Sequence, residues 1–156
     1  TPYLCKPIEF GADIVVHALT KYIGGHSDVM LGSLSVANET LYERIGAARA
    51  ALGLSVSPDE ASLALRGLQT LAVRLERLER STLEVAYWLA GRPEIDVVLH
   101  PALPGCPGHE YWKRDFIGSA SVFSIVFRDE IPTDAVSAFV DALELFWTCN
   151  GFAPVT

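Results

Sequence analysis

The sequence predicts an α/β fold, and three of its features lead to that expectation. Short apolar runs typical of buried strands occur at 13–18, 29–36, 95–100 and 119–128, and the first of them is rich in β-branched residues. Segments with the apolar spacing of amphipathic helices separate and follow these runs. Half of the 156 residues are apolar, which is enough to build a core. Strands and helices in this order fit α/β or α+β layers.

The helices are predicted from signals at their ends. A helix over 38–52 has Asn38 as its expected N-cap and Gly53 as its stop. The run Ser57-Pro58-Asp59-Glu60 reads as a capping box, and the predicted long helix continues from it to Ala90. The expected apolar face of this helix comprises Leu68, Leu71, Leu75, Leu78, Leu83, Val85 and Leu89.

Two shorter helices are expected further on, one over 109–116 and one from Thr133 or Asp134 to about Phe146. The long helix is the expected bridge between two domains, with the boundary near residues 60–70. The predicted domains are therefore 1–60 and 61–156.

Composition restricts the partners. With a net charge of −7, the chain has no basic field to attract nucleic acid or an anionic membrane. No apolar run reaches the roughly 18 residues of a membrane span. The three cysteines (Cys5, Cys106 and Cys149) are too scattered for a disulfide framework or a metal knuckle, and they favour reduced thiols in a cytoplasmic protein.

Lys21 is the first candidate for chemistry. It ends an apolar strand, follows Thr20, and precedes a turn at Gly24-Gly25. Burial favours the neutral form of an amine, and a neutral amine forms a Schiff base with an aldehyde. The Thr20 hydroxyl and nearby backbone N–H groups would suit a phosphate beside it. On composition alone, however, an ordinary surface lysine at a strand end is the commoner case.

Two other clusters are weaker candidates. Catalytic triads are assembled from separate segments, so the consecutive His26-Ser27-Asp28 is expected to form a hydrogen-bonded turn that buries its polar groups. Cys106 and His109 offer a thiol and an imidazole but lack a second pair, so a metal site is not predicted there.

Several spaced motifs resemble one enzyme family in the same order. The run Gly11-Ala12-Asp13-Ile14, followed by Thr20-Lys21-Tyr22 and Gly25-His26-Ser27-Asp28, is similar to the lysine motif of the pyridoxal-phosphate (PLP) enzymes of cysteine and methionine metabolism, the transsulfuration family. Residues 66–74 (RGLQTLAVR) resemble a helix of that family. Residues 100–116 and 118–127 resemble its bacterial cystathionine β-lyase branch. The resemblance extends over about residues 1–146.

The resemblance implies a fold and residue roles. The implied fold is part of fold type I, aspartate aminotransferase-like: the end of the large PLP domain (1–60) and part of the small C-terminal domain. Lys21 matches the lysine that forms the Schiff base with PLP and then acts as the base. Thr20 matches a hydroxyl that contacts the cofactor phosphate, and Ala18 stands where many members have a phosphate-binding serine.

The implied activity is that of a carbon–sulfur lyase in methionine biosynthesis, which converts cystathionine to homocysteine, pyruvate and ammonia in a homotetramer. Cystathionine γ-synthase or γ-lyase chemistry remains an alternative, as does an inactive fragment that only associates with other chains. Family members are much longer and carry further cofactor-binding residues upstream, and the tail at 147–156 departs from their pattern. The resemblance therefore implies a fragment, by a frameshift or an incomplete gene sequence, that is a poor enzyme alone.

Overall fold

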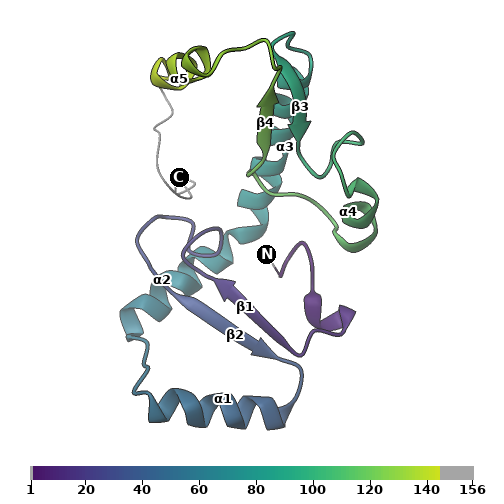
Figure 1. The fold of residues 1–156 in the computed structure, drawn as a ribbon. Helices are drawn as coiled ribbons and strands as arrows, with labels where there is room; N and C mark the ends of the chain where they lie inside the picture. Colours follow the sequence, from purple (N-terminus) through teal and green to yellow (C-terminus); the bar gives the residue numbers. More distant parts are fainter. Residues whose placement is uncertain (1, 145–156) are drawn as a thin grey trace. The chain divides into compact units, whose positions relative to one another are not determined.

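The computed structural model describes residues 2–144 (Figure 1). These residues form two compact units, and the division falls between Leu75 and Glu76, inside helix α3 (Leu71–Ala90). The sequence predicts an earlier boundary, and the assignment of 1–60 and 61–156 to two domains of the family stays a prediction.

The first unit contains a two-stranded sheet. A 3₁₀ turn, η1 (Pro7–Phe10), precedes strand β1 (Ile14–Ala18), which pairs antiparallel with β2 (Gly32–Val36). The register sets Ile14 opposite Val36 and Ala18 opposite Gly32. Helix α1 (Glu39–Ala51) follows and contacts β2. Both strands lie inside the predicted ranges, although β2 is three residues shorter at its start.

The expectation that both strands are buried is wrong for the described residues. Val16 is 76% exposed and Leu34, its partner across the ladder, is 55% exposed. Side chains alternate across a strand, so these two residues occupy the same face of the sheet. Within residues 2–144 each strand pairs only with the other, and this two-stranded sheet leaves that apolar face largely uncovered.

The caps predicted for the first two helices are present, whereas the cap predicted at Thr133 or Asp134 is not, because Pro132 takes the N-cap position of α5 without a side-chain hydrogen bond. The Asn38 side chain accepts a hydrogen bond from the amide of Leu41 at 3.0 Å, at the start of α1. Ser57 and Glu60 form the capping box reciprocally: Ser57 Oγ accepts from the Glu60 amide at 3.1 Å, and a Glu60 carboxylate oxygen accepts from the Ser57 amide at 3.1 Å. This capping box fixes the start of α2 (Pro58–Gln69).

The predicted single helix from Ser57 to Ala90 is in fact two helices. Helix α2 ends at Gln69, and α3 begins at Leu71 after a non-helical Thr70. In a continuous helix the Gly67 carbonyl would accept from the amide of Leu71. Here it accepts from the Thr70 amide at 3.2 Å and from the Arg74 guanidinium at 2.7 Å.

The predicted apolar face is divided with the helix. Leu71 and Leu75 of α3 are buried, as expected. Leu68, which belongs to α2, is 50% exposed, so it lies outside the buried stripe.

The second unit has its own core. After α3 come strand β3 (Ile95–Leu99), helix α4 (His109–Asp115), strand β4 (Ser124–Phe127) and helix α5 (Thr133–Asp141). Strands β3 and β4 pair antiparallel with an irregularity between Ile95 and Val97. The buried cluster consists of Ala86, Ile95, Val98 and Leu103, and Leu83, Leu89, Phe123, Ile125 and Phe127 pack against it.

The elements of this unit are shorter than predicted, by one residue in β3 and α4 and by more in β4 and α5. Strand β4 is less than half the length of the predicted 119–128 strand, and Ser119 instead bonds to Glu79. Helix α5 ends at Asp141, short of the predicted Phe146. Phe146, Cys149 and the divergent tail 147–156 lie outside the described residues.

Candidate functional site around Lys21

Lys21 lies in a tight turn directly after β1. The strand ends at Ala18, and the chain turns back through two hydrogen bonds. The Gly24 amide donates to the Leu19 carbonyl at 2.7 Å, and the Gly25 amide donates to the Lys21 carbonyl at 2.8 Å. Gly25 has a φ of +71°, a left-handed conformation that favours glycine. We call residues 19–25 the lysine turn.

The strand side of the lysine turn is attached to a single residue, Leu31. The Leu19 amide donates to the Leu31 carbonyl at 2.8 Å, and the Thr20 amide does so at 3.3 Å. The Thr20 hydroxyl accepts from the Leu31 amide at 3.0 Å and donates to the Leu31 carbonyl at 3.3 Å. The sequence places Thr20 beside Lys21, and the structure shows that its hydroxyl holds the turn against the chain entering β2.

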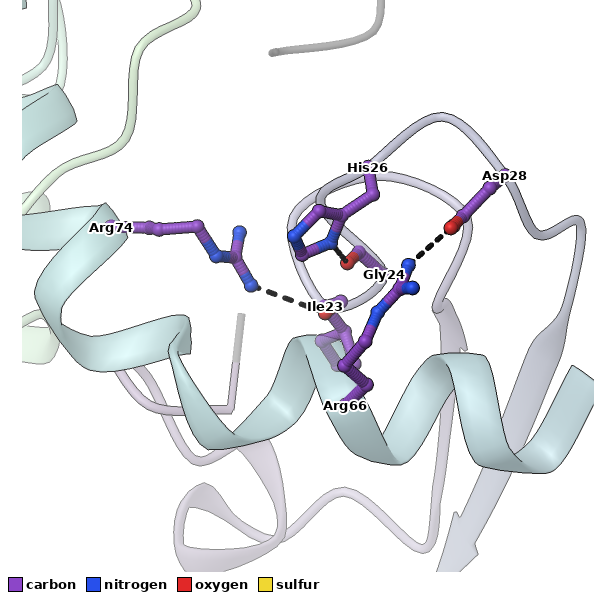
Figure 2. A network of polar contacts seen from close by, with 6 residues as sticks. All are labelled: Ile23, Gly24, His26, Asp28, Arg66 and Arg74. Atoms are coloured by element: carbon purple, nitrogen blue, oxygen red, sulfur yellow. Dashed lines mark hydrogen bonds and ion pairs between the residues drawn. The ribbon is translucent and has the colours of Figure 1, made fainter.

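The helical side of the lysine turn is attached to Arg74 (Figure 2). Its guanidinium donates to the carbonyls of Tyr22 at 2.7 Å and Ile23 at 3.2 Å. Burial lowers the pKa of Arg74 from its ordinary value. An arginine begins so far above neutrality that this side chain stays a cation.

The Lys21 side chain is exposed. The burial expected to favour a neutral amine is therefore not provided by residues 2–144, and that part of the prediction is wrong for the described chain. The reason is the open surroundings of the turn: only its far side, at Ile23 and Gly24, is buried.

The lysine turn suits one half of PLP better than the other. An exposed primary amine on a hydrogen-bonded turn is accessible to an aldehyde. The phosphate half finds few donors, because the amides of Thr20, Gly24 and Gly25 already bond to carbonyls and Ala18 has no hydroxyl. To donate to a phosphate, the Thr20 hydroxyl would give up its 3.3 Å contact with the Leu31 carbonyl.

A histidine lies on the strand leading to this turn. His17 is partly buried in β1, and its Nε2 has no hydrogen-bond partner among the described residues. Burial lowers the pKa of His17, so its imidazole is neutral near pH 7 and adds no positive charge next to Lys21.

The run His26-Ser27-Asp28 forms a turn, as predicted, and not a triad. His26 Nδ1 lies 2.7 Å from the Gly24 carbonyl, and Asp28 pairs with Arg66 of α2 (Figure 2). The three side chains are exposed, so the expectation that the turn buries them is wrong.

The thiol and imidazole of the second unit are separately engaged. His109 Nδ1 lies 2.8 Å from the Pro101 carbonyl, and its ring stacks on Trp112. Cys106 Sγ lies 3.7 Å from the Pro107 carbonyl. Within the described part of the chain, no group of three or more histidine, cysteine or acidic side chains is placed to hold a metal ion. Among the same residues, no helix has the length and apolar character to cross a membrane.

Arg74 and two glycines were missed as site residues by sequence reasoning. A Cβ on Gly25 would collide with the Arg74 guanidinium, and a Cβ on Gly67 would collide with the carbonyls of Ile23 and Gly24. Two of the three, Gly67 and Arg74, lie inside the motif RGLQTLAVR at 66–74, which the sequence analysis placed on a helix without a role.

Comparisons with known proteins identify the family to which this chain belongs. The model of the Cys/Met metabolism PLP-dependent enzymes matches residues 1–154. The chain is 43% identical over 143 residues to the cystathionine beta-lyase of Escherichia coli and 42% identical over 143 residues to that of Haemophilus influenzae. Each alignment covers 92% of this chain and 36% of the relative.

A solved structure agrees with the family assignment. Cystathionine gamma synthase from Xanthomonas oryzae, in complex with aminoacrylate and cysteine, superposes with a TM-score of 0.92 at 38% identity, covering 99% of this chain and 40% of that one. The chain therefore belongs to the Cys/Met metabolism family of PLP-dependent enzymes, and its fold is part of their α/β fold. It spans just over a third of the length of these curated relatives.

Proposed function

We propose that this chain is the lysine-bearing part of a PLP-dependent carbon–sulfur lyase of the cystathionine β-lyase type. The observation that carries the proposal is the placement of Lys21, exposed on a turn that is hydrogen bonded on both sides, in a chain 43% identical to a protein named cystathionine beta-lyase. The substrate is cystathionine, and the products are homocysteine, pyruvate and ammonia. The proposed setting is a cytoplasmic homotetramer that serves methionine biosynthesis.

The proposed roles follow from the chemistry of each group. PLP, when bound, serves as the electron sink for the carbanion formed at the substrate Cα. The Lys21 amine would hold the cofactor through its aldehyde carbon, and as a free amine it would take the proton from the substrate Cα. The Thr20 hydroxyl donates to the cofactor phosphate when it leaves the Leu31 carbonyl. Walls that desolvate Lys21 and further phosphate donors would come from outside residues 2–144.

The test is to trap the bond to Lys21. The chain is incubated with PLP and reduced with borohydride, which converts the carbon–nitrogen double bond, formed with loss of water, to a stable secondary amine. The lysines of the chain are Lys6, Lys21 and Lys113, so the other two serve as internal references in peptide mapping. Label concentrated on Lys21 is expected, and equal labelling of all three would refute the assignment.

The γ-reactions are the second candidate. The superposition on a cystathionine gamma synthase at a TM-score of 0.92 favours them as much as the sequence relatives favour β-elimination. Product analysis separates the two: pyruvate indicates β-elimination, and 2-oxobutyrate indicates γ-elimination. A chain that leaves Lys21 unlabelled and releases neither product would favour the third possibility, an inactive partner of other chains.

A further inference from the structure

Arg74 makes four hydrogen bonds to described residues, and every acceptor is a neutral oxygen. Besides the Tyr22 and Ile23 carbonyls, Nη2 donates to the Gly67 carbonyl at 2.7 Å and Nε donates to Thr70 Oγ1 at 3.0 Å. An arginine on a helix surface more often reaches water or a carboxylate. Here three of the four hydrogen bonds go to backbone carbonyls, which indicates that the guanidinium holds that backbone in place.

The guanidinium joins two segments that are about fifty positions apart in the sequence. Its planar fork has donors in fixed directions, so bonds made by both ends restrict the relative position of the groups they reach. One set of acceptors lies in the lysine turn, and the other lies where α2 gives way to α3. Arg74 therefore fixes the lysine turn to the α2–α3 junction.

Two glycines make this contact possible. Gly25 leaves the space that the guanidinium occupies, and Gly67 lets α2 approach the carbonyls of Ile23 and Gly24. Gly67 is buried in this approach. The contact between the lysine turn and the α2–α3 junction thus depends on Arg74, Gly25 and Gly67 together, and not on the length of the Arg74 side chain alone.

We propose that Arg74 is a positioning residue for Lys21, an inference that rests on the proposed function of that lysine. The carbonyls held by Arg74 belong to the first and second residues after Lys21, so they set the direction in which the backbone leaves it. Thr20 holds the other side of Lys21 through Leu31. With Arg74 removed, the turn loses these hydrogen bonds to its Tyr22 and Ile23 carbonyls while it keeps the bonds to Leu31, and the amine samples positions away from the aldehyde. Displacement of a reacting group by about 1 Å lowers rates by around 100-fold.

A nearby ion pair is a weaker attachment. Arg66 of α2 pairs with Asp28, three residues after the lysine turn, but their side chains are 51% and 34% exposed. Pairs in water contribute little, whereas hydrogen bonds from a charged group to partly buried carbonyls contribute more. We therefore assign the positioning role to Arg74.

The experiment compares Arg74→Ala, Arg74→Lys and the control Arg80→Ala in the full chain. Arg80 is an exposed arginine of the same helix that pairs with Glu76 four residues earlier. Two quantities are measured. The first is hydrogen exchange at the amides of Gly24 and Gly25, whose acceptors lie within the turn. The second is the ratio of borohydride-trapped PLP on Lys21 to that on Lys6 and Lys113.

In Arg74→Ala, we expect exchange at the two glycine amides to rise by about tenfold or more, the order of effect for losing a charge-assisted hydrogen bond. The labelling ratio should fall toward that of the reference lysines. Arg74→Lys, which keeps the charge but has one nitrogen, should restore part of both quantities. Arg80→Ala should change neither. Exchange in the β1–β2 ladder of the first unit shows whether the unit that contains Arg74 remains folded.

The possible results distinguish a failure of the positioning role of Arg74 from a failure of the proposed function. Selective Lys21 labelling in the unaltered chain that persists in both Arg74 variants would overturn the positioning role. Failure of the unaltered chain to label Lys21 selectively would instead overturn the proposed function. If Arg74→Ala unfolds the chain, Arg74→Lys decides: unchanged exchange and labelling refute the inference, and a partial loss of both supports it.

Discussion

At the residue scale, His100 shows how burial selects a protonation state. It is 1% exposed and contacts the edge of Phe123, with ring centroids 5.8 Å apart. Its Nδ1 accepts from the Ala102 amide at 3.2 Å, while Nε2 has no hydrogen-bond partner among the described residues. Burial lowers the pKa of His100. The Ala120 carbonyl, which falls short of hydrogen-bond geometry, and the charge of Glu79 offset this only in part.

The expected consequence is a stability that falls with acidity. The folded-state pKa of His100 lies below that of an unfolded histidine, about 6.5, so the unfolded chain binds the proton first as pH drops. This contribution is complete above the unfolded pKa and is lost as pH falls below it toward the folded value.

The measurement is the urea midpoint at about pH 7.5 and about pH 5.5, on either side of the histidine pKa. The variant His100→Asn keeps an acceptor for Ala102 but does not titrate, so it should show a smaller drop between the two pH values. His17, whose pKa burial also lowers, contributes equally in both proteins. An identical drop in variant and parent would exclude His100 as a source of the pH dependence.

At the scale of single elements, the start of α2 depends on hydrogen bonds between residues that are close together in the sequence. The Ser57–Glu60 capping box satisfies backbone donors that have no partner inside the helix. Ser57→Ala should lower the free energy of unfolding by about 0.5–2 kcal/mol. Ser62→Ala is a matched control, because this exposed serine lies inside the same helix, where alanine is the better helix former. Urea unfolding of both variants would test this, and equal midpoints would show that the cap contributes nothing measurable.

The capping box could be predicted from sequence, whereas the break at Thr70 could not. A cap is recognised from four consecutive residues, Ser57 to Glu60. The break depends on Arg74 competing for the Gly67 carbonyl while it also bonds to Tyr22 and Ile23. Those contacts span about fifty positions, and the leucine spacing across Thr70 continues as though the helix were unbroken. The local sequence pattern therefore predicts which residues are helical, but it does not predict the junction between α2 and α3 that contacts the lysine turn.

The same dependence on contacts between distant residues explains which features of the strands and of the site the sequence could not predict. Short apolar runs correctly predicted strands at β1 and β2, and the β-branched residues of β1 suit extended backbone. Their burial depends on what covers the sheet, which a local pattern does not contain; Val16 is 76% exposed. Lys21 was found through motif resemblance, while the hydroxyl bonds of Thr20 to Leu31 and the role of Arg74 required the folded chain.

At the scale of the whole molecule, the first unit carries a hollow with many apolar lining residues. A cavity of about 590 Å³ is lined by Val16, Leu34, Val36, Tyr42 and Ile45, among others, between the sheet and α1. Large exposed apolar surfaces on a soluble chain favour association. The curated relatives are nearly three times as long as the part this chain matches, so they contain much more chain with which to cover such a surface.

We therefore expect residues 1–156, purified alone, to self-associate and to lose PLP during gel filtration. The exposed edges of β1 and β2 and the uncovered Val16–Leu34 face both promote contact between copies. A double variant, Val16→Thr with Leu34→Thr, places a β-branched residue with a hydroxyl group at both strand positions, and should shift the chain toward the monomer. Light scattering after chromatography measures the mass, and visible absorbance measures retained cofactor. Because few phosphate donors are free around Lys21, neither protein should keep the cofactor. A monomeric parent chain that elutes with bound PLP would show that residues 1–156 already form a closed, cofactor-competent fold.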